Sequence, residues 1–328
     1  MIAVTGANGL LGSFIIRELI KQKETFIALK RKGSDLSLLE DVQGQIQWLD
    51  ADILDPVSLN DAFQNVSHVI HAAAMVSFNP RVRNQIFRIN IEGTQNVVNV
   101  CQANGVKKLV HISSVAALGR LKEHTEIDED HKWIDNALNS TYAESKYLAE
   151  LEVIRAYEEG LHVVILNPSV ILAAADWTKS SAKLFKYVWD ESRFYIDSHL
   201  NYVDVRDVAL AAYKLLKADV NGERFILNAG SLELSSFFAL TAARFNKKAP
   251  TIKLNPALLK TVAFLEGVRS WLIRSEPLIT SETARLAGTR FLYRNEKIRK
   301  ALNFQFQTID QTLNWCCEYY MNKPGAKK

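Results

Sequence analysis

The stretch Ile2-Ala3-Val4-Thr5-Gly6-Ala7-Asn8-Gly9-Leu10-Leu11-Gly12 decides the fold of this 328-residue chain. A short apolar run leads into three glycines spaced three residues apart, and a helical pattern of apolar residues follows. Gly6 permits a tight turn, Gly9 lets backbone N–H groups approach a pyrophosphate, and Gly12 allows the helix to pack closely. The stretch therefore predicts a strand, a turn and a helix that bind a dinucleotide; a glycine turn without a ligand is the alternative.

Short apolar runs alternate with helical patterns over the first 230 residues. The runs are apolar at successive positions, which favours a parallel sheet covered by helices on both faces. We expect strands at residues 2–5, 25–29, 46–49, 68–72, 108–112 and 162–166, and helices at residues 11–21, 57–64, 80–104 and 142–159.

The alternation weakens after about Leu172, and helical patterns dominate the rest of the chain. We expect helices, or the approaches to helices, at residues 201–216 and 235–245, and a strand at residues 224–228. The sequence thus predicts an α/β fold in which residues 1–172 form a doubly wound parallel sheet that binds the dinucleotide. Residues 173–328 form a smaller, mostly helical substrate-binding portion, of which residues near 200–230 return to the main sheet.

Composition and charge exclude several classes of protein. The chain is 48% hydrophobic and 23% charged with a net charge of +4, and its basic residues are scattered, so no nucleic-acid binding is expected. Cys101 and the adjacent Cys316-Cys317 give no disulfide framework, and the histidines show no metal-ligand spacing. With a first strand that begins at Ile2, we expect no leader peptide, no metal and a cytoplasmic protein.

The most apolar late stretch, residues 256–273, is interrupted by Lys260, Glu266 and Arg269, so no membrane span is expected. Its apolar residues recur at helical spacing. We expect a helix that packs over the substrate cleft; weak peripheral association with a membrane is the alternative.

Two positions beyond the glycine turn predict further cofactor contacts. The second strand ends in Lys30-Arg31-Lys32, where enzymes that use NAD commonly carry an acid for the ribose 2′-hydroxyl. Arg31 is the best candidate to bind the 2′-phosphate of NADP, because a guanidinium makes bidentate contacts; a solvated basic loop is the alternative. Asp52 and Ile53 follow the third strand and are candidates to bind the adenine amine and to pack against its ring.

Tyr142 and Lys146 lie four residues apart in a predicted helix, so their side chains share one face. A lysine in that position can keep a nearby phenol acidic enough to exchange a proton near neutral pH. Thr141 and Glu144 predict a capping box, which places Tyr142 in the first turn of the helix.

Ser113 and Ser114 end a predicted central strand, and the alternation of a strand sends only one of the two hydroxyls toward Tyr142. That hydroxyl can donate a hydrogen bond to a substrate oxygen. Together with the glycine turn, the serine pair and the Tyr-x-x-x-Lys spacing indicate an oxidoreductase that uses a nicotinamide cofactor.

These features resemble the extended short-chain dehydrogenase/reductase family, in particular its dihydroflavonol-reductase-like branch. The resemblance extends over nearly the whole chain and implies a Rossmann-type fold. Its sequence blocks, in order, are the glycine turn of residues 5–12, Asp52-Ile53, His71-Ala72-Ala73-Ala74, Asn90-Ile91-Glu92-Gly93-Thr94, Ser113-Ser114, Tyr142 with Lys146, Asn167-Pro168-Ser169, and Asn201-Tyr202-Val203-Asp204-Val205-Arg206-Asp207-Val208-Ala209.

The resemblance also implies roles for individual residues. Ser114 would face the substrate, Tyr142 would be the acid/base, and Lys146 would be its partner and a ligand of the cofactor ribose. The helices at residues 80–104 and 142–159 would pair across a twofold axis in a homodimer. Phe78, Leu118 and Trp177 would be either pocket walls or core residues. The cofactor-binding residues that it implies are Gly6, Asn8, Gly9, Leu10, Leu11, Gly12, Arg31, Asp52, Ile53, Ala72, Ala73, Ala74, Tyr142, Lys146, Pro168 and Ser169.

We therefore expect an oxidoreductase that depends on NADP(H), with NAD less favoured, and acts as a carbonyl reductase or alcohol dehydrogenase on a small to medium organic substrate. A nucleotide-sugar epimerase or dehydratase of the same family is the first alternative. Dehydratases of this kind place an Asp-Glu pair after the serine position, whereas Val115-Ala116 stands here. A non-catalytic dinucleotide-binding protein is the second alternative, although such relatives often lose the tyrosine or the lysine.

Overall fold

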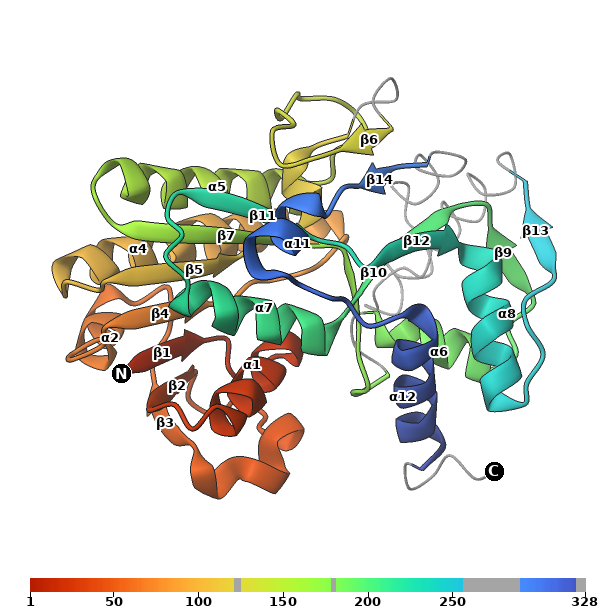
Figure 1. Cartoon of the computed structure of the whole chain (residues 1–328), viewed down its shortest axis with the longest axis horizontal. Coiled ribbons are helices and arrows are strands. Elements are labelled where there is room, and N and C mark those ends of the chain that lie inside the picture. The colour runs from red at the N-terminus through yellow and green to blue at the C-terminus, as the bar shows by residue number, and fades with distance from the viewer. Residues whose placement is uncertain (121–124, 178–180, 256–289, 323–328) are drawn as a thin grey trace.

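The computed structural model describes residues 1–120, 125–177, 181–255 and 290–322. A seven-stranded parallel sheet with its helices occupies one side of the molecule, and a smaller portion with short strands and helices occupies the other (Figure 1). The segment at residues 256–273, expected to be an apolar helix, lies outside the described residues. No helix of the described ranges is long and apolar enough to cross a bilayer.

The large sheet has the strand order β11-β7-β5-β4-β1-β2-β3, and each neighbouring pair is parallel. The order reverses between β1 and β4, and a sheet of this kind binds ligands at the carboxyl ends of the strands beside that reversal. This arrangement confirms the predicted doubly wound sheet. Its strands are β1 (Ile2–Thr5), β2 (Phe26–Lys30), β3 (Gln47–Asp50), β4 (His68–His71), β5 (Lys108–Ile112), β7 (His162–Pro168) and β11 (Glu223–Leu227).

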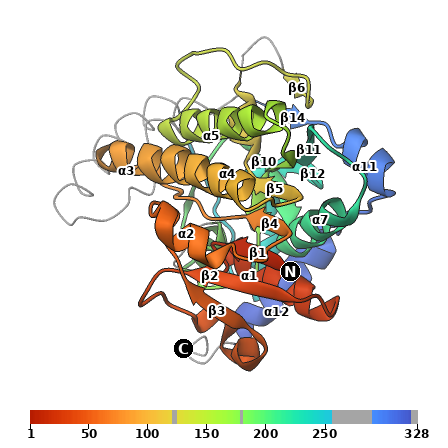
Figure 2. The ribbon, with the colours of Figure 1, turned by 90° about the vertical axis from the view of Figure 1, so that its left-hand side faces the viewer.

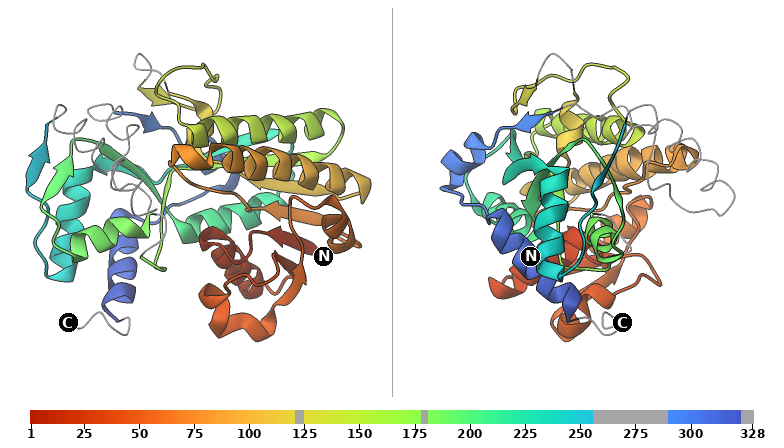
Figure 3. Two further views of the ribbon diagram at one scale, coloured as in Figure 1. Left: turned by 180° about the vertical axis from the view of Figure 1, so that it is seen from behind. Right: turned by 90° about the vertical axis from the view of Figure 1, so that its right-hand side faces the viewer.

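Helices cover both faces of this sheet, as Figures 2 and 3 show. Helices α1 (Leu10–Lys21) and α7 (Val205–Lys217) pack on one face; α2 (Pro56–Ala62), α4 (Gly93–Ala103) and α5 (Thr141–Glu158) pack on the other. Successive strand residues therefore enter opposite cores: Val4 is buried against α1 and α7, and Ala3 against the other layer. Both faces need apolar side chains, so the strands read as continuous apolar runs.

The long helix expected at residues 80–104 is not continuous. It consists of a 3₁₀ turn (Pro80–Val82), α3 (Arg83–Phe87), a π-helical turn (Arg88–Glu92) and α4. The hydroxyl of Thr94 donates a hydrogen bond of 2.6 Å to the carbonyl oxygen of Asn90 inside the widened turn. Hydrogen bonds from side chains to the backbone compete with the regular helical hydrogen bonds. Single π-helical turns within α-helices are frequent at functional sites.

The predicted cap of α5 was wrong by one residue. Ser140, not Thr141, is the N-cap: its hydroxyl accepts a hydrogen bond from the backbone N–H of Ala143 at 3.0 Å. A capping side chain must stand outside the helix with extended backbone angles, and Ser140 has those angles whereas Thr141 is the first helical residue. Tyr142 nevertheless lies in the first turn, as expected.

The helix expected from residue 201 begins later. Residues 199–204 form strand β10 (His199–Asp204), which pairs with β8 (Val170–Leu172) and β12 (Gly230–Glu233), and α7 follows. The buried carboxylate of Asp204 accepts the N–H of Arg206 and so caps α7. These residues form a strand because they pair with β8 and β12, which are distant in the sequence. A local helical pattern cannot reveal such pairing.

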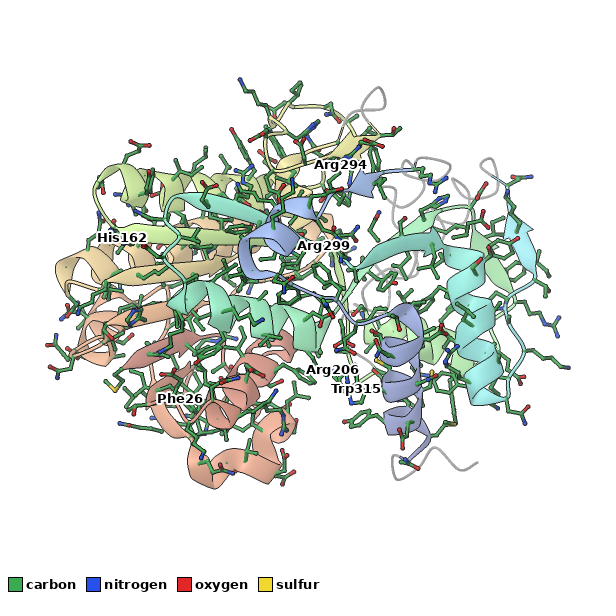
Figure 4. The ribbon with its side chains drawn as sticks, in the orientation of Figure 1. Phe26, His162, Arg206, Arg294, Arg299 and Trp315 are labelled. Atoms are coloured by element: carbon green, nitrogen blue, oxygen red, sulfur yellow. The ribbon has the colours of Figure 1, made fainter. Side chains whose placement is uncertain are left out.

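The smaller portion contains more strand than expected. Besides its three-stranded sheet, β9 (Phe194–Ile196) pairs with β13 (Ile252–Leu254), and β6 (Glu126–Ile127) pairs with β14 (Leu292–Tyr293). Helices α6 (Ala182–Trp189), α8 (Leu234–Phe245) and α12 (Ile309–Met321) share an aromatic core, and α11 (Glu296–Leu302) packs near β11. The guanidinium of Arg206 lies 4.1 Å from the ring centre of Trp315, where α7 meets α12 (Figure 4).

Candidate active site

The glycine turn lies between β1, α1 and the segment that follows β4. Gly6 has a φ of +67°, and a Cβ added there would lie 2.6 Å from the backbone nitrogen of Ala73. A Cβ at Gly12 would collide with the carbonyl oxygen of Gly6. The positive φ and both close approaches require glycine at these positions.

The first turn of α1 follows the glycine turn directly, and no side chain caps its backbone N–H groups. Gly9 is the N-cap residue and offers no side chain to bind them, and Leu10 and Leu11 open the helix. The amide of Asn8 donates to the carbonyl oxygen of Asp35 at 3.2 Å, which ties the turn to the segment after β2. Uncapped N–H groups and the helix dipole fit the pyrophosphate of a dinucleotide.

A cavity of about 550 Å³ opens at the ends of β2 and β3. Lys30 is bound to Asp50 of the neighbouring strand, but the exposed Arg31 forms no ion pair with any residue in the described ranges. A free guanidinium at the rim suits a phosphate better than a lysine that is already paired. The cavity is lined by Arg31, Lys32, Gly33, Ser34, Asp50, Ala51, Asp52, Asp55 and Ser58.

Asp52 lines this cavity, and the next residue, Ile53, lies against the start of α4. One carboxylate oxygen of Asp52 accepts the N–H of Leu54 at 2.9 Å, which leaves its second oxygen for another donor. The side chain of Ile53 lies against Gly93, where an added Cβ would be 2.6 Å from its Cδ1 atom. The structure therefore brings both residues to the cavity side of the sheet, next to the residues of the π turn.

Ser114, Tyr142 and Lys146 meet at the end of β5. The Ser114 hydroxyl lies close enough to the Tyr142 phenol to lower its pKa, and the Ser114 oxygen accepts the N–H of Ala116 at 3.1 Å. Lys146 is 2% exposed and donates from Nζ to the carbonyl oxygen of Ile112 at 2.9 Å. The three side chains predicted from the sequence thus lie together, and Ser114 is the serine that faces Tyr142.

The two ionisable groups of this cluster shift in the directions that burial imposes. Burial raises the pKa of Tyr142 to about 12, and the neighbouring Ser114 hydroxyl opposes that shift. Burial lowers the pKa of Lys146 to about 8, while the charge of Glu150 opposes it. Lys146 is not among the groups that shift the pKa of Tyr142 in this arrangement. The expected acidification of the phenol by the lysine is therefore not visible in the structure.

The segment after β4 and the end of β7 form the far side of the site. The N–H of Ala73 donates to the Thr5 hydroxyl at 3.3 Å, and the exposed Ala74 follows. Ala72 is also bonded through its N–H to the carbonyl oxygen of Thr5, at 3.2 Å. Pro168 and Ser169 are buried, and the Ser169 hydroxyl has no hydrogen-bond partner among the described residues. An unpartnered buried hydroxyl at this position fits a bound polar group such as a carboxamide.

A buried histidine connects β4 to the π turn. The Thr94 hydroxyl donates its hydrogen bond to the carbonyl oxygen of Asn90. It therefore accepts a hydrogen bond from Nε2 of His71, at 3.1 Å. The other ring nitrogen of His71 then accepts from the Thr5 hydroxyl at 2.6 Å. Burial holds the pKa of His71 near 3, so the ring is neutral and serves as a link between hydroxyls.

Asn90 continues this link to the helix that carries Tyr142. Its amide donates to the Ser145 hydroxyl at 2.9 Å, and that hydroxyl donates to the carbonyl oxygen of Tyr142 at 2.8 Å. Asn90 also exchanges two hydrogen bonds with the backbone of Met75, at 2.7 and 3.0 Å. The π turn therefore fixes both the segment after β4 and the first turn of α5.

Of the three possible pocket walls, Phe78 has its ring against that of Tyr142. Its ring is 49% exposed and meets the tyrosine edge to face, with 6.0 Å between ring centres. Leu118 is fully buried in a small core cluster, and Trp177 stacks on Tyr320 in the smaller portion. Leu118 thus belongs to a core cluster, whereas Trp177 is half-buried at the edge of one.

The ranges that the structure describes contain no group of three His, Cys, Asp or Glu residues that could bind a metal ion. His68 and His71, the closest pair in sequence, have separate partners: the ring of His68 contacts the Ser67 hydroxyl at 2.9 Å.

Known proteins resemble the chain in both sequence and structure. A putative dihydroflavonol 4-reductase of Synechocystis sp. is 27% identical over 330 residues, which cover 99% of this chain and 95% of that protein. Cinnamoyl-CoA reductase 1 of Petunia hybrida is 29% identical over 242 residues, covering 69% of this chain and 72% of that protein. The crystal structure of gox2253 superimposes with a TM-score of 0.83 at 26% identity and covers 98% of this chain and 97% of that one.

The family profile that matches extends over residues 2–230, which include the glycine turn, the serine, the tyrosine and the lysine. The resemblance to extended short-chain dehydrogenases/reductases is thereby confirmed, as is the expectation of an enzyme that uses a nicotinamide dinucleotide. The chain belongs to the NAD dependent epimerase/dehydratase family.

Proposed function

We propose that the protein is an NADP(H)-dependent carbonyl reductase or alcohol dehydrogenase acting on a small to medium organic substrate. The observation that carries this proposal is that the Ser114 and Tyr142 hydroxyls are neighbours at the end of β5, with Lys146 one helical turn from Tyr142. Two neighbouring hydroxyls can donate hydrogen bonds to one substrate oxygen. The names of two reductases among the relatives support the same chemistry.

A nicotinamide cofactor held by residues 6–12 and the segments after β4 and β7 would supply the hydride chemistry at the substrate carbon. In the reducing direction, Tyr142 donates its proton to the carbonyl oxygen as charge develops there, and Ser114 donates a second hydrogen bond. The raised pKa of Tyr142 means that the phenol is protonated at neutral pH and ready to act as the acid. In the oxidising direction the phenol must lose its proton, so a nearby positive charge becomes necessary.

Lys146 supplies that positive charge. With a pKa of about 8, its amine is mostly an ammonium at neutral pH. It can turn from the Ile112 carbonyl toward the ribose hydroxyls of a bound cofactor, because a lysine has four rotatable side-chain bonds. Pro168, Ser169 and Ala72 to Ala74 would contact the nicotinamide half, and residues 6–12 would contact the pyrophosphate.

Arg31 supports NADP over NAD as the cofactor. Its guanidinium is exposed at the rim of the cavity and is not neutralised by any residue that the structure describes. An acid that would accept the ribose 2′-hydroxyl of NAD is absent at the end of β2. Asp50 ends the neighbouring strand but is already paired with Lys30.

The substrate would approach over Phe78 and residues 173–328, which we propose contribute the substrate-binding portion. Val76 and Phe78 are 54% and 49% exposed, so an apolar surface lies next to the Tyr142 ring. Apolar surface of this kind suits the ring or chain of an organic carbonyl compound better than a nucleotide sugar.

A nucleotide-sugar epimerase of the same family is the second candidate, because the description of the matching family names epimerases. Dehydration is less well supported: Val115 and Ala116, which follow Ser114, are buried apolar residues and offer no acid or base. The test is a screen of aldehydes, ketones and nucleotide sugars with NADPH and NADH. Reduction of a carbonyl compound that consumes NADPH is expected; epimerisation of a nucleotide sugar without net consumption would contradict the proposal.

A further inference from the structure

A third side chain lies on the face of α5 that carries Tyr142 and Lys146. Glu150 follows Lys146 by four residues, and its side chain is fully buried. A buried carboxylate is costly unless charged or polar groups compensate for the lost water. The groups around Glu150 therefore indicate what its charge is used for.

Two neighbouring strands supply the partners of Glu150. Its Oε1 atom accepts a hydrogen bond from Nδ2 of Asn167, in β7, at 2.6 Å. Its Oε2 atom lies 2.8 Å from Nη2 of Arg224, in β11. The same Nδ2 of Asn167 donates to the carbonyl oxygen of Ser114 at 2.9 Å. One side chain thus links the Glu150 carboxylate to the backbone of the serine.

The other groups that face Lys146 do not provide a negative charge. His71 on β4 and His111 on β5 are its histidine neighbours. Burial and the charge of Lys146 keep the pKa of both rings well below the usual value. Tyr142 is a neutral phenol, and Ile112 offers only its carbonyl oxygen. Among the residues described, Glu150 is the acid whose charge raises the pKa of Lys146.

We propose that Glu150 is a positioning residue of the reaction: it keeps the Lys146 side chain charged beside Tyr142 and fixes the Ser114 backbone through Asn167. This role rests on the proposed function, since Glu150 acts through the residues assigned there. It touches neither the substrate nor the reacting atoms.

The test replaces Glu150 by glutamine, which keeps the size of the side chain and an oxygen for Asn167 but removes the charge. The ¹³Cε signal of Lys146, assigned by its loss in Lys146→Met, is followed through a pH titration. The midpoint is expected to fall by about one pH unit or more in Glu150→Gln, the usual scale for losing a neighbouring opposite charge. NADPH binding, measured by fluorescence, should weaken at a correspondingly lower pH.

Glu152→Gln is the matched control on the same helix. Glu152 pairs with Arg155 at 3.0 Å, away from the site, and its replacement should leave both midpoints unchanged. The double variant Glu150→Met/Arg224→Met removes the buried ion pair as a whole, so neither charge is left uncompensated, and the lysine midpoint should again fall. This second variant decides the question if Glu150→Gln does not fold, as circular dichroism would show.

An unchanged lysine midpoint in Glu150→Gln, or in the double variant if Glu150→Gln does not fold, would overturn the role of Glu150. The titration needs neither cofactor nor turnover. If the unmutated protein bound neither NADPH nor NADH, the proposed function would be refuted, while the lysine titration would still decide whether Glu150 keeps Lys146 charged.

Discussion

Lys146 Nζ and the carbonyl oxygen of Ile112 are 2.9 Å apart, so the ammonium of α5 is hydrogen-bonded to the strand that ends in the serine pair. This contact fixes the Lys146 side chain at the end of β5, and Lys146 lies one helical turn from Tyr142. A buried cation needs a hydrogen-bond acceptor, so Lys146 can leave the Ile112 carbonyl only for another oxygen. The proposed ribose contact of Lys146 requires such an exchange.

Lys146→Met should therefore damage both cofactor binding and turnover. Methionine preserves most of the volume but removes the charge that serves the tyrosine and the ribose. We expect turnover to fall by about 10²–10⁴-fold, the usual range for a disturbed proton transfer. NADPH affinity should fall by about tenfold or more, as for one lost charge-assisted hydrogen bond. Fluorescence titration with NADPH measures the second effect, and undiminished affinity would show that the lysine does not contact the cofactor.

Cofactor preference tests Arg31. NADPH should bind more tightly than NADH, and Arg31→Ala should reduce the difference by about 1–3 kcal/mol, the scale of a hydrogen bond to a charged group. NADH affinity should hardly change. Lys32→Ala, which removes the adjacent exposed cation, is the control and should have a smaller effect. Calorimetry gives both affinities, and equal values in the unmutated protein would contradict the assignment.

Much of the fold could be predicted because its signals are local. The strands at Ile2–Thr5 and Lys108–Ile112 were predicted with their observed limits, since each is a short apolar run between turn residues. Gly6 and Gly12 were recognised because only glycine satisfies the backbone angles and the close approaches that the turn requires.

The errors arose where distant contacts decide the structure. Strand β10 forms because its residues pair with β8 and β12, which no local pattern reveals. The π turn at Asn90 depends on Thr94 and on bonds to Met75 and Ser145. Glu150 was missed as well, although its position four residues after Lys146 is a signal that could have found it.

The pH dependence of stability tests Asp207. Burial raises the pKa of this carboxyl to about 7. Asp207 accepts a hydrogen bond of 2.8 Å from the N–H of Gln307, which lowers the pKa, whereas the charge of Asp204 raises it further. The folded protein therefore holds a proton on Asp207 in a range where the unfolded chain has released it. The stability that this group contributes is present below about pH 4 and is lost as the pH rises through about 7.

Asp207→Asn should remove that dependence while it keeps an oxygen for Gln307. Urea unfolding at pH 5 and pH 7.5 gives the two free energies of unfolding. We expect the difference between them to shrink by about 1–3 kcal/mol in the variant, given 1.4 kcal/mol for each pKa unit. Asp61→Asn, at an exposed position on α2, is the control. An unaltered difference in Asp207→Asn would mean that Asp207 is already ionised in the folded protein at pH 5.

We propose a homodimer that pairs α4 and α5 with their copies across a twofold axis. Leu151 and Tyr157 on α5 are 41% and 38% exposed, which places apolar side chains on the outer surface of that helix. Leu151→Glu should convert the dimer to a monomer, because a buried unpaired carboxylate is costly. Val57→Glu, at a 70% exposed position on α2, should leave the dimer intact. Light scattering at micromolar concentration measures the mass, and a monomer of the unmutated chain would refute the pairing.

Tyr142→Phe tests the chemistry most directly. Phenylalanine keeps the ring and its edge-to-face contact with Phe78 but removes the hydroxyl that we propose as the proton donor. Turnover should drop by about 10²–10⁴-fold on whichever carbonyl compound the screen identifies, the usual contribution of a positioned acid. NADPH affinity should remain within a few-fold of the unmutated protein, because Lys146 keeps its ammonium and its contact with Ile112.

Ser114→Ala is the companion variant. It removes one donor to the reacting oxygen and also the hydroxyl that opposes the rise in the pKa of Tyr142. Its effect should therefore fall mainly on turnover, by about 10²–10³-fold, with little change in NADPH affinity. Near-normal turnover in Tyr142→Phe would show that another group supplies the proton, and a phenol that merely packs against the substrate would then replace the acid in this mechanism.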